Sequence, residues 1–397
     1  MERRRFPLFD GLRALAATLV FVFHSWAFVN AGDFAAFVES HSVLGSAWAN
    51  GADRLGVLGV ALFYVISAFL LYRPFVAARL AGHDGPDLRR YALRRAARIV
   101  PAYWLALTVV CLIEGRSDVL SLRGIFQTYL FGGIYDGHAL WFNNPLPAAW
   151  TIAVEVTFYI FLPFWAALVG AACARSRDPV RRELSMLVGL AAVGFGWKLV
   201  VIATSSTENT IQPLTVALPA SLDVFAAGMG MAVLSAAKPE WARRPADLLA
   251  RRSGALWLGA LLVYGAMCWL AAATGPTGED WRSKVMILGV MKVIVATALV
   301  LPAVVRSDEG GAPRRFLRFR PVVWVGLVSY GLYLWQVPVL KRIVEIDGFS
   351  KPPIAEFPFI SLLALAITLV IAAASWYLLE RRVLAWANSR FRSRVRH

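Results

Sequence analysis

Residues 56–72 read GVLGVALFYVISAFLLY, an apolar run without one charged side chain. At about 1.5 Å per residue, a helix of this length crosses most of the roughly 30 Å hydrocarbon core of a bilayer. The rest of the 397-residue chain has the same character, with 58% hydrophobic and only 17% charged residues and a mean hydropathy of +0.59. A water-soluble protein cannot bury so much apolar surface, so the composition predicts a polytopic membrane protein.

Ten apolar segments are long enough to be candidate transmembrane helices. They lie at residues 9–28, 56–73, 100–114, 148–172, 185–203, 214–235, 254–273, 284–305, 322–340 and 357–379. The third is short, and residues 121–133 form an amphipathic stretch that either lies in the interface or re-enters the membrane. We expect an all-α integral membrane protein, a bundle of about ten transmembrane helices within residues 1–380, followed by a basic tail at 381–397.

The charge balance indicates how the chain is oriented. It has 41 Lys and Arg against 25 Asp and Glu, a net charge of +16, which in a soluble chain would suggest nucleic acid. Sorted by alternate loops, 30 of the basic residues fall on the side of the N-terminus, 8 on the other side and three within spans. The positive-inside rule explains this distribution without a nucleic-acid partner. It predicts a multi-pass protein of the cytoplasmic (inner) membrane, with both termini in the cytoplasm.

The first span carries three ionisable residues, Asp10, Arg13 and His24. At 100° per residue all three point to one face, with His24 about 22 Å above the cytoplasmic end. Such groups in a bilayer are costly and usually functional, although Asp10 and Arg13 could simply pair at the interface and His24 could be a helix-contact residue. The span also resembles a signal peptide. Secretion does not require these groups, so we expect a retained helix.

A second intramembrane carboxylate lies in residues 150–159, WTIAVEVTFY. Glu155 lies about 9 Å below the outer edge at 1.5 Å per residue, roughly the depth of His24. A nearby histidine could hydrogen-bond to such a carboxyl group or share its proton. The alternative is a helix–helix hydrogen bond.

The most basic loop precedes the third span and contains Arg95 and Arg98. Their spacing of three places them on one helical face. Paired guanidinium groups suit phosphates, which they bind bidentately. A loop that follows the positive-inside rule would look much the same, so the pair alone does not indicate a site.

Taken in order, these segments resemble the membrane acyltransferase 3 family over nearly the whole chain. The correspondences are Arg13 and His24, separated by ten residues; residues 63–69 (FYVISAF), similar to an aromatic–aromatic–x–x–Ser–Gly–Phe motif; Arg95 and Arg98 before Pro101 and Tyr103; Glu155 within 150–159; and residues 223–229 (DVFAAGM) and 329–335 (SYGLYLW). Each motif alone is loose, but six in order on the expected spans are specific.

The chain departs from the family pattern at two positions. Ala68 stands where the family usually has Gly, and we expect this to change only helix packing. Gln336 stands where many members have a second His, which we expect to be dispensable. His24 is then the sole candidate base, because the other histidines lie in loops or at the terminus. They are His41, His83, His138 and His397.

The resemblance implies transfer of an acyl group, typically acetyl from acetyl-CoA, to a hydroxyl of a sugar or glycosylated acceptor. Acyl-CoA is then a co-substrate, with no permanently bound cofactor and no metal. The nucleotide would dock on the cytoplasmic arginines, and its pantetheine arm would carry the thioester up to His24 as general base. The residues assigned on this basis are His24, Glu155 and Asp10 for catalysis, Arg13, Arg95 and Arg98 for the donor, and Tyr64, Ser67 and Trp150 as substrate or oxyanion candidates.

Two other functions compete with this interpretation. A transporter or flippase for a lipid-linked glycan would use intramembrane charges as substrate or proton sites. The chain shows neither the inverted repeat nor the paired broken helices that many transporters have. The unrelated membrane-bound O-acyltransferases need a His on an internal span, whereas His24 is on the first. The acceptor stays open among a surface polysaccharide, a cell-wall glycolipid and an antibiotic's sugar or hydroxyl.

Overall fold

The computed structural model describes residues 8–30, 43–135, 144–204, 214, 217–273, 281–305, 311–346 and 357–390. All regular elements within these ranges are helices. Nine of the described helices are long and apolar enough to cross a membrane, and a further apolar helix, Leu288–Val304, is shorter. The prediction of an all-α polytopic membrane protein is therefore confirmed. His41, His138 and His397 lie outside the described residues.

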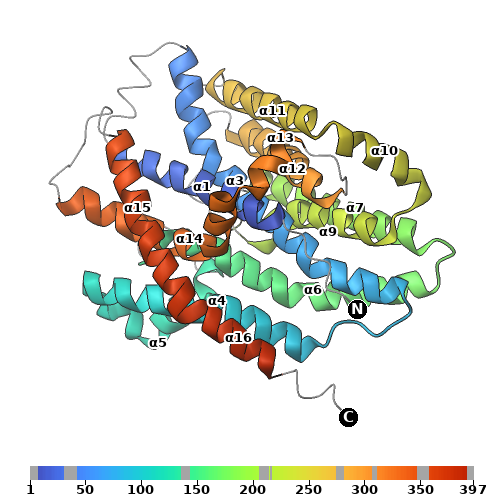
Figure 1. Cartoon of the computed structure of the whole chain (residues 1–397), viewed down its shortest axis with the longest axis horizontal. Coiled ribbons are helices and arrows are strands. Elements are labelled where there is room, and N and C mark those ends of the chain that lie inside the picture. The colour runs from blue at the N-terminus through green and yellow to red at the C-terminus, as the bar shows by residue number, and fades with distance from the viewer. Residues whose placement is uncertain are drawn as a thin grey trace.

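Ten long helices in the described part of the chain form the bundle (Figure 1). They are α1 (Leu8–Asn30), α3 (Val43–Leu80), α4 (Leu88–Glu114), α6 (Trp150–Ala174), α7 (Pro179–Thr204), α9 (Leu222–Ala237), α11 (Ser253–Ala273), α12 (Trp281–Val304), α14 (Arg320–Ile346) and α15 (Phe357–Ser375). Four shorter ones are α5 (Leu122–Gly124), α10 (Glu240–Arg251), α13 (Ala312–Arg318) and α16 (Arg381–Ser389).

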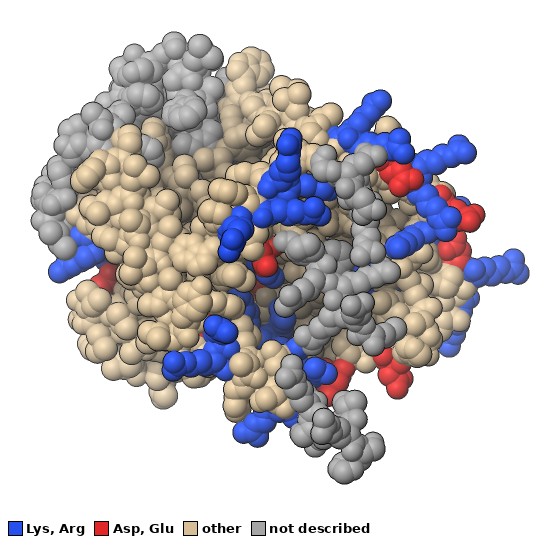
Figure 2. All heavy atoms as spheres, in the orientation of Figure 1, with Lys and Arg blue, Asp and Glu red and all other residues tan. Residues whose placement is uncertain are grey.

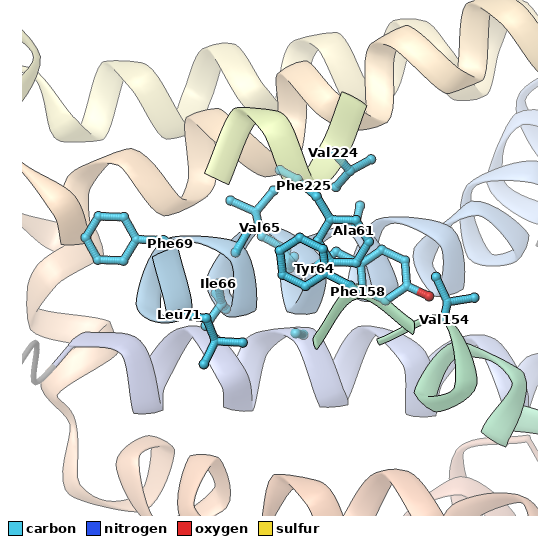
Figure 3. Packing of buried hydrophobic residues seen from close by; sticks show 14 of the residues in the cluster. Ala61, Tyr64, Val65, Ile66, Phe69, Leu71, Val154, Phe158, Val224 and Phe225 are labelled. Atoms are coloured by element: carbon cyan, nitrogen blue, oxygen red, sulfur yellow. The ribbon is translucent and has the colours of Figure 1, made fainter. Parts of the chain in front are cut away.

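Helix α3 is central to the packing, because it contacts α1, α6, α9, α11 and α12. Its Tyr64 stacks on Phe225 of α9 with ring centroids 4.7 Å apart, and Phe225 stacks in turn on Phe158 of α6 at 3.9 Å (Figure 3). Gly228 of α9 lies so close to α3 that an added Cβ would be 2.7 Å from the Cβ of Ala68. The Ala that departs from the family pattern therefore lies in a helix-packing contact, as expected.

Helix α4 is longer than its apolar part. Its first turn is capped by Asp87, whose side chain accepts hydrogen bonds from the backbone N–H groups of Arg89 and Arg90. It ends at Gly115, whose φ of 66° is the left-handed conformation that favours glycine. The sequence predicted a span beginning at residue 100. The cap instead starts the helix at Leu88, which places the arginine pair inside a continuous helix.

Two amphipathic helices lie where the sequence predicted loop or tail. Helix α10 follows α9, and α16 follows α15 through a π-helical turn at Trp376–Glu380. Both α16 and this turn pack against α4. The domain boundary at residue 380 stays a prediction, although the residues just beyond it are part of the packed structure.

We call the end of the bundle where α1 and α4 begin and α3 ends the basic end. In the view of Figure 2, Lys and Arg side chains gather over the right half and the lower middle of the molecule. The left half is mostly uncharged where it is coloured. This asymmetry agrees with the uneven distribution of basic residues along the sequence.

Candidate active site

A cavity of about 100 Å³ lies among α1, α3, α4, α6 and α14. Its walls combine three arginines, one carboxylate and several hydroxyl groups with apolar side chains. The polar lining residues are Arg13, Tyr64, Ser67, Arg95, Arg98, Thr151, Glu155, Tyr159, Ser329, Tyr330 and Tyr333. Predicted site residues from four separate sequence segments therefore meet at one cavity.

The three arginines lie toward the basic end and differ in how their charge is compensated. Arg13 pairs with Asp10 at 3.1 Å, and Arg98 pairs with Glu380 at 3.5 Å. The Nε of Arg95 is buried and has no hydrogen-bond partner within the described residues. Its guanidinium carbon lies 5.8 Å from the centroid of the Tyr159 ring. Arg95 thus places a buried donor at the cavity, which is the arrangement expected of an anion-binding residue.

Glu155 faces the same cavity and accepts two hydrogen bonds on one oxygen. The hydroxyl of Ser67 donates to its Oε1, and the hydroxyl of Tyr159 donates to the same atom at 2.6 Å. The sequence predicted a partnership between Glu155 and His24. The structure gives Glu155 these two partners instead.

Away from the arginines, a layer of aromatic and hydroxyl side chains lines the cavity. The Tyr333 hydroxyl donates to the carbonyl of Ala148 at 2.7 Å and shares a 2.5 Å hydrogen bond with the Thr151 hydroxyl. Tyr64 donates to the carbonyl of Thr151 at 3.2 Å. Phe63 packs edge-on against Tyr333 with ring centroids 5.9 Å apart. We call Phe63, Tyr64, Thr151 and Tyr333 the tyrosine layer.

His24 does not line the cavity. Its Nδ1 lies 3.0 Å from the carbonyl oxygen of Val20, and because a carbonyl only accepts, Nδ1 carries the proton. The Nε2 of the neutral ring therefore has the free lone pair that a general base needs. The ring interacts with Gln336, which lies one helical turn beyond Tyr333 on α14. His24 is thus placed beyond the tyrosine layer, on the side away from the arginines.

The remaining predicted residues have more peripheral positions. Asp10 reaches the site only through Arg13. Trp150 begins α6 and packs against the apolar core without lining the cavity. Sequence reasoning missed Thr151, Tyr159 and several other lining residues. Residues 329–335 had been singled out as a family motif, so Tyr330 and Tyr333, two polar residues of that motif, could have been predicted as site residues.

Comparisons with known proteins identify the family of the chain. The acyltransferase 3 family, described as an acyltransferase domain, matches residues 7–373. The chain is 22% identical to the peptidoglycan O-acetyltransferase OatA of Listeria monocytogenes over 96% of this chain and 56% of that one. It is 27% identical to the putative peptidoglycan O-acetyltransferase YrhL of Bacillus subtilis over 99% and 57% of the two chains. It is 23% identical to nodulation protein 10 of Rhizobium leguminosarum bv. viciae over 96% and 94%.

The chain spans little more than half the length of the two peptidoglycan O-acetyltransferases. No solved structure matches it. The family match covers most of the chain and includes the cavity-lining residues. The chain therefore belongs to the acyltransferase 3 family.

Proposed function

We propose that this protein transfers an acyl group, acetyl in the simplest case, from acyl-CoA to a hydroxyl of a carbohydrate acceptor. The observation that carries the proposal is the single cavity in which Arg13, Arg95 and Arg98 lie near Glu155 and Ser67. Three guanidinium groups suit the phosphates of the nucleotide, and the hydroxyl and carboxylate groups suit acyl transfer. The family membership and the names of the relatives support the same reaction type.

In this proposal the donor enters from the basic end, which we expect to face the cytoplasm because of its positive charge. The phosphates bind Arg95 and Arg98, with Arg13 beside them, and the pantetheine arm extends toward Glu155. Arg95 is the strongest candidate for direct phosphate contact, because its buried Nε has no partner among the described residues. A bound phosphate oxygen would satisfy that donor.

The chemical step uses His24 as the base. Its Nε2 takes the proton of the acceptor hydroxyl, whose oxygen attacks the thioester carbonyl. The C–S bond then breaks, and the thiolate of CoA takes the proton back from the imidazolium. Of the three oxyanion candidates, Ser67 and Tyr64 line the cavity and carry hydroxyl groups that could stabilise the oxyanion, whereas Trp150 does not line it.

The tyrosine layer lies between the donor cavity and His24, so turnover requires the layer to open. Opening would break the hydrogen bonds of Tyr333 to Ala148 and Thr151. This arrangement keeps the acyl donor on one side and the base on the other until both substrates are bound. We propose that the acceptor reaches His24 from the end of the bundle opposite the basic end.

The acceptor class follows from the relatives. Two of them are named peptidoglycan O-acetyltransferases, one putatively. We therefore propose a hydroxyl of a cell-wall or related polysaccharide on the outer face of the membrane.

The test is reconstitution into sealed vesicles of known orientation, with acetyl-CoA on one side and an impermeant glycan on the other. We expect acetylated glycan and free CoA thiol only when acetyl-CoA faces the basic end. Transfer only with both substrates on that side would refute the cross-membrane route. Glycan movement without release of CoA thiol would instead identify a flippase.

A further inference from the structure

Glu380 is a buried carboxylate beyond the last residue matched by the family. The match ends at residue 373, whereas Glu380 closes the π-helical turn that connects α15 to α16. It is the only carboxylate in residues 357–389 and is only 2% exposed. A buried carboxylate is costly unless it is paired and hydrogen-bonded, so its partners show what it does.

Both oxygens of Glu380 have a partner. Its Oε2 lies 3.5 Å from Nη1 of Arg98, and its Oε1 accepts a hydrogen bond from the Ser375 hydroxyl at 3.0 Å. Ser375 ends α15, so the carboxylate is held by its own helix while it faces α4. Its orientation is therefore fixed independently of Arg98.

The Arg98 guanidinium is also held by aromatic rings. Its central carbon lies 5.6 Å from the Tyr330 ring centroid on α14 and 5.5 Å from the Trp376 ring centroid in the π-helical turn. Tyr330 is fixed in turn, because its hydroxyl donates to the carbonyl of Ile99 at 2.9 Å. Two rings and one carboxylate thus restrain a side chain that would otherwise lose considerable rotamer entropy on binding an anion.

The single contact with Glu380 leaves most of the Arg98 donors available. A guanidinium has five N–H groups, and the carboxylate engages only Nη1, at a long distance. Arg98 still lines the donor cavity. A carboxylate that competed with phosphate would be expected to form a short, bidentate pair instead.

We propose that Glu380 is a positioning residue that holds Arg98 in the orientation that binds the phosphates of acyl-CoA. The C-terminal turn and α16 are then part of the donor site. Asn388 of α16 extends the same contact, because its Oδ1 accepts from Nε of Arg94 at 2.7 Å. This inference rests on the proposed function of the cavity and adds to it a role for residues beyond the family match.

The test is Glu380→Gln in the full-length protein, with acetyl-CoA as the varied substrate. We expect KM for acetyl-CoA to rise about tenfold with kcat within about twofold, the size of one weakened hydrogen bond to a charged group. Calorimetry with coenzyme A should show the same loss of affinity. Glu380→Asp retains the charge and should restore most of the affinity.

Glu183→Gln is the matched control. Glu183 is also buried and pairs with an arginine, Arg79, but neither residue lines the cavity. This variant should lose thermal stability and keep KM for acetyl-CoA. If Glu380→Gln behaves in the same way, or if it binds coenzyme A more tightly, Glu380 does not position Arg98.

Arg98→Ala separates this proposal from the proposed function. If Arg98→Ala weakens coenzyme A binding and Glu380→Gln does not, only the positioning role fails. If neither Arg98→Ala nor Arg95→Ala weakens binding, the cavity is not the donor site and the proposed function fails with it.

Discussion

Replacing Arg95 by Ala tests the donor site with the least disturbance of the fold. Arg95 has no acidic partner within the described residues, so its removal leaves no carboxylate unpaired. A hydrogen bond between charged groups contributes about 1.5–3 kcal/mol, which corresponds to a factor of about 10 to 150 in affinity. We therefore expect Arg95→Ala to raise KM for acetyl-CoA by about that factor while the unfolding temperature stays unchanged.

The assay is release of the CoA thiol at varied acetyl-CoA concentration, together with thermal unfolding of the same preparations. Arg89→Ala is the matched control, because Arg89 lies on the same helix, is exposed and does not line the cavity. It should keep KM for acetyl-CoA. Arg98→Ala should raise KM and also lower the unfolding temperature, since it leaves the buried Glu380 without its cation. An unchanged KM in Arg95→Ala would refute the assignment of the cavity.

Three further predictions concern the base, the cavity carboxylate and an ion pair outside the site. His24→Ala should slow transfer by about 10²–10⁴-fold with normal unfolding, and a variant that keeps more than half the rate would exclude His24 as the base. Glu155→Gln should retain coenzyme A binding but slow transfer at saturating acetyl-CoA; weaker binding with unchanged kcat would contradict this. Asp223 pairs with the buried Lys198 at 2.5 Å, joining α9 to α7, so Asp223→Asn should destabilise the protein by about 3–5 kcal/mol without altering KM. Thermal unfolding measures the Asp223 effect, and an unchanged unfolding temperature would show that the pair contributes nothing.

Contacts along one helix were predictable from the sequence, because the helical repeat determines them. The spacing of Arg95 and Arg98 placed both on one face, and both line the cavity. Asp10 and Arg13 form an ion pair at 3.1 Å, the contact that was the alternative to a functional role for them. The arithmetic of rise and rotation needs no knowledge of neighbouring helices, which is why it succeeds here.

Contacts between helices were not predictable in the same way. The rise per residue predicted similar depths in the membrane for Glu155 and His24. It does not determine how α6 is rotated about its axis relative to α1. That rotation depends on packing, for example on the stacking of Phe158 of α6 against Phe225 of α9 with ring centroids 3.9 Å apart. Glu155 faces Ser67 of α3 in this packing. Glu380 was missed for the same reason, because its role depends on how the π-helical turn packs against α4.

The replacement of the usual second histidine by Gln336 is consistent with a single base at His24. Gln336 is fully buried, and its Nε2 donates to the carbonyl of Tyr333 at 3.2 Å, which leaves Oε1 without a hydrogen-bond partner within the described residues. In the proposed mechanism His24 takes a proton on Nε2, so the ring gains an N–H donor for which Oε1 of Gln336 is an available acceptor. The amide cannot remove the proton, but it can stabilise the imidazolium until the thiolate accepts that proton. In the proposed mechanism, Gln336 therefore supports His24 without being a second base itself. Gln336 also links His24 to Tyr333, a member of the tyrosine layer that we propose opens for transfer.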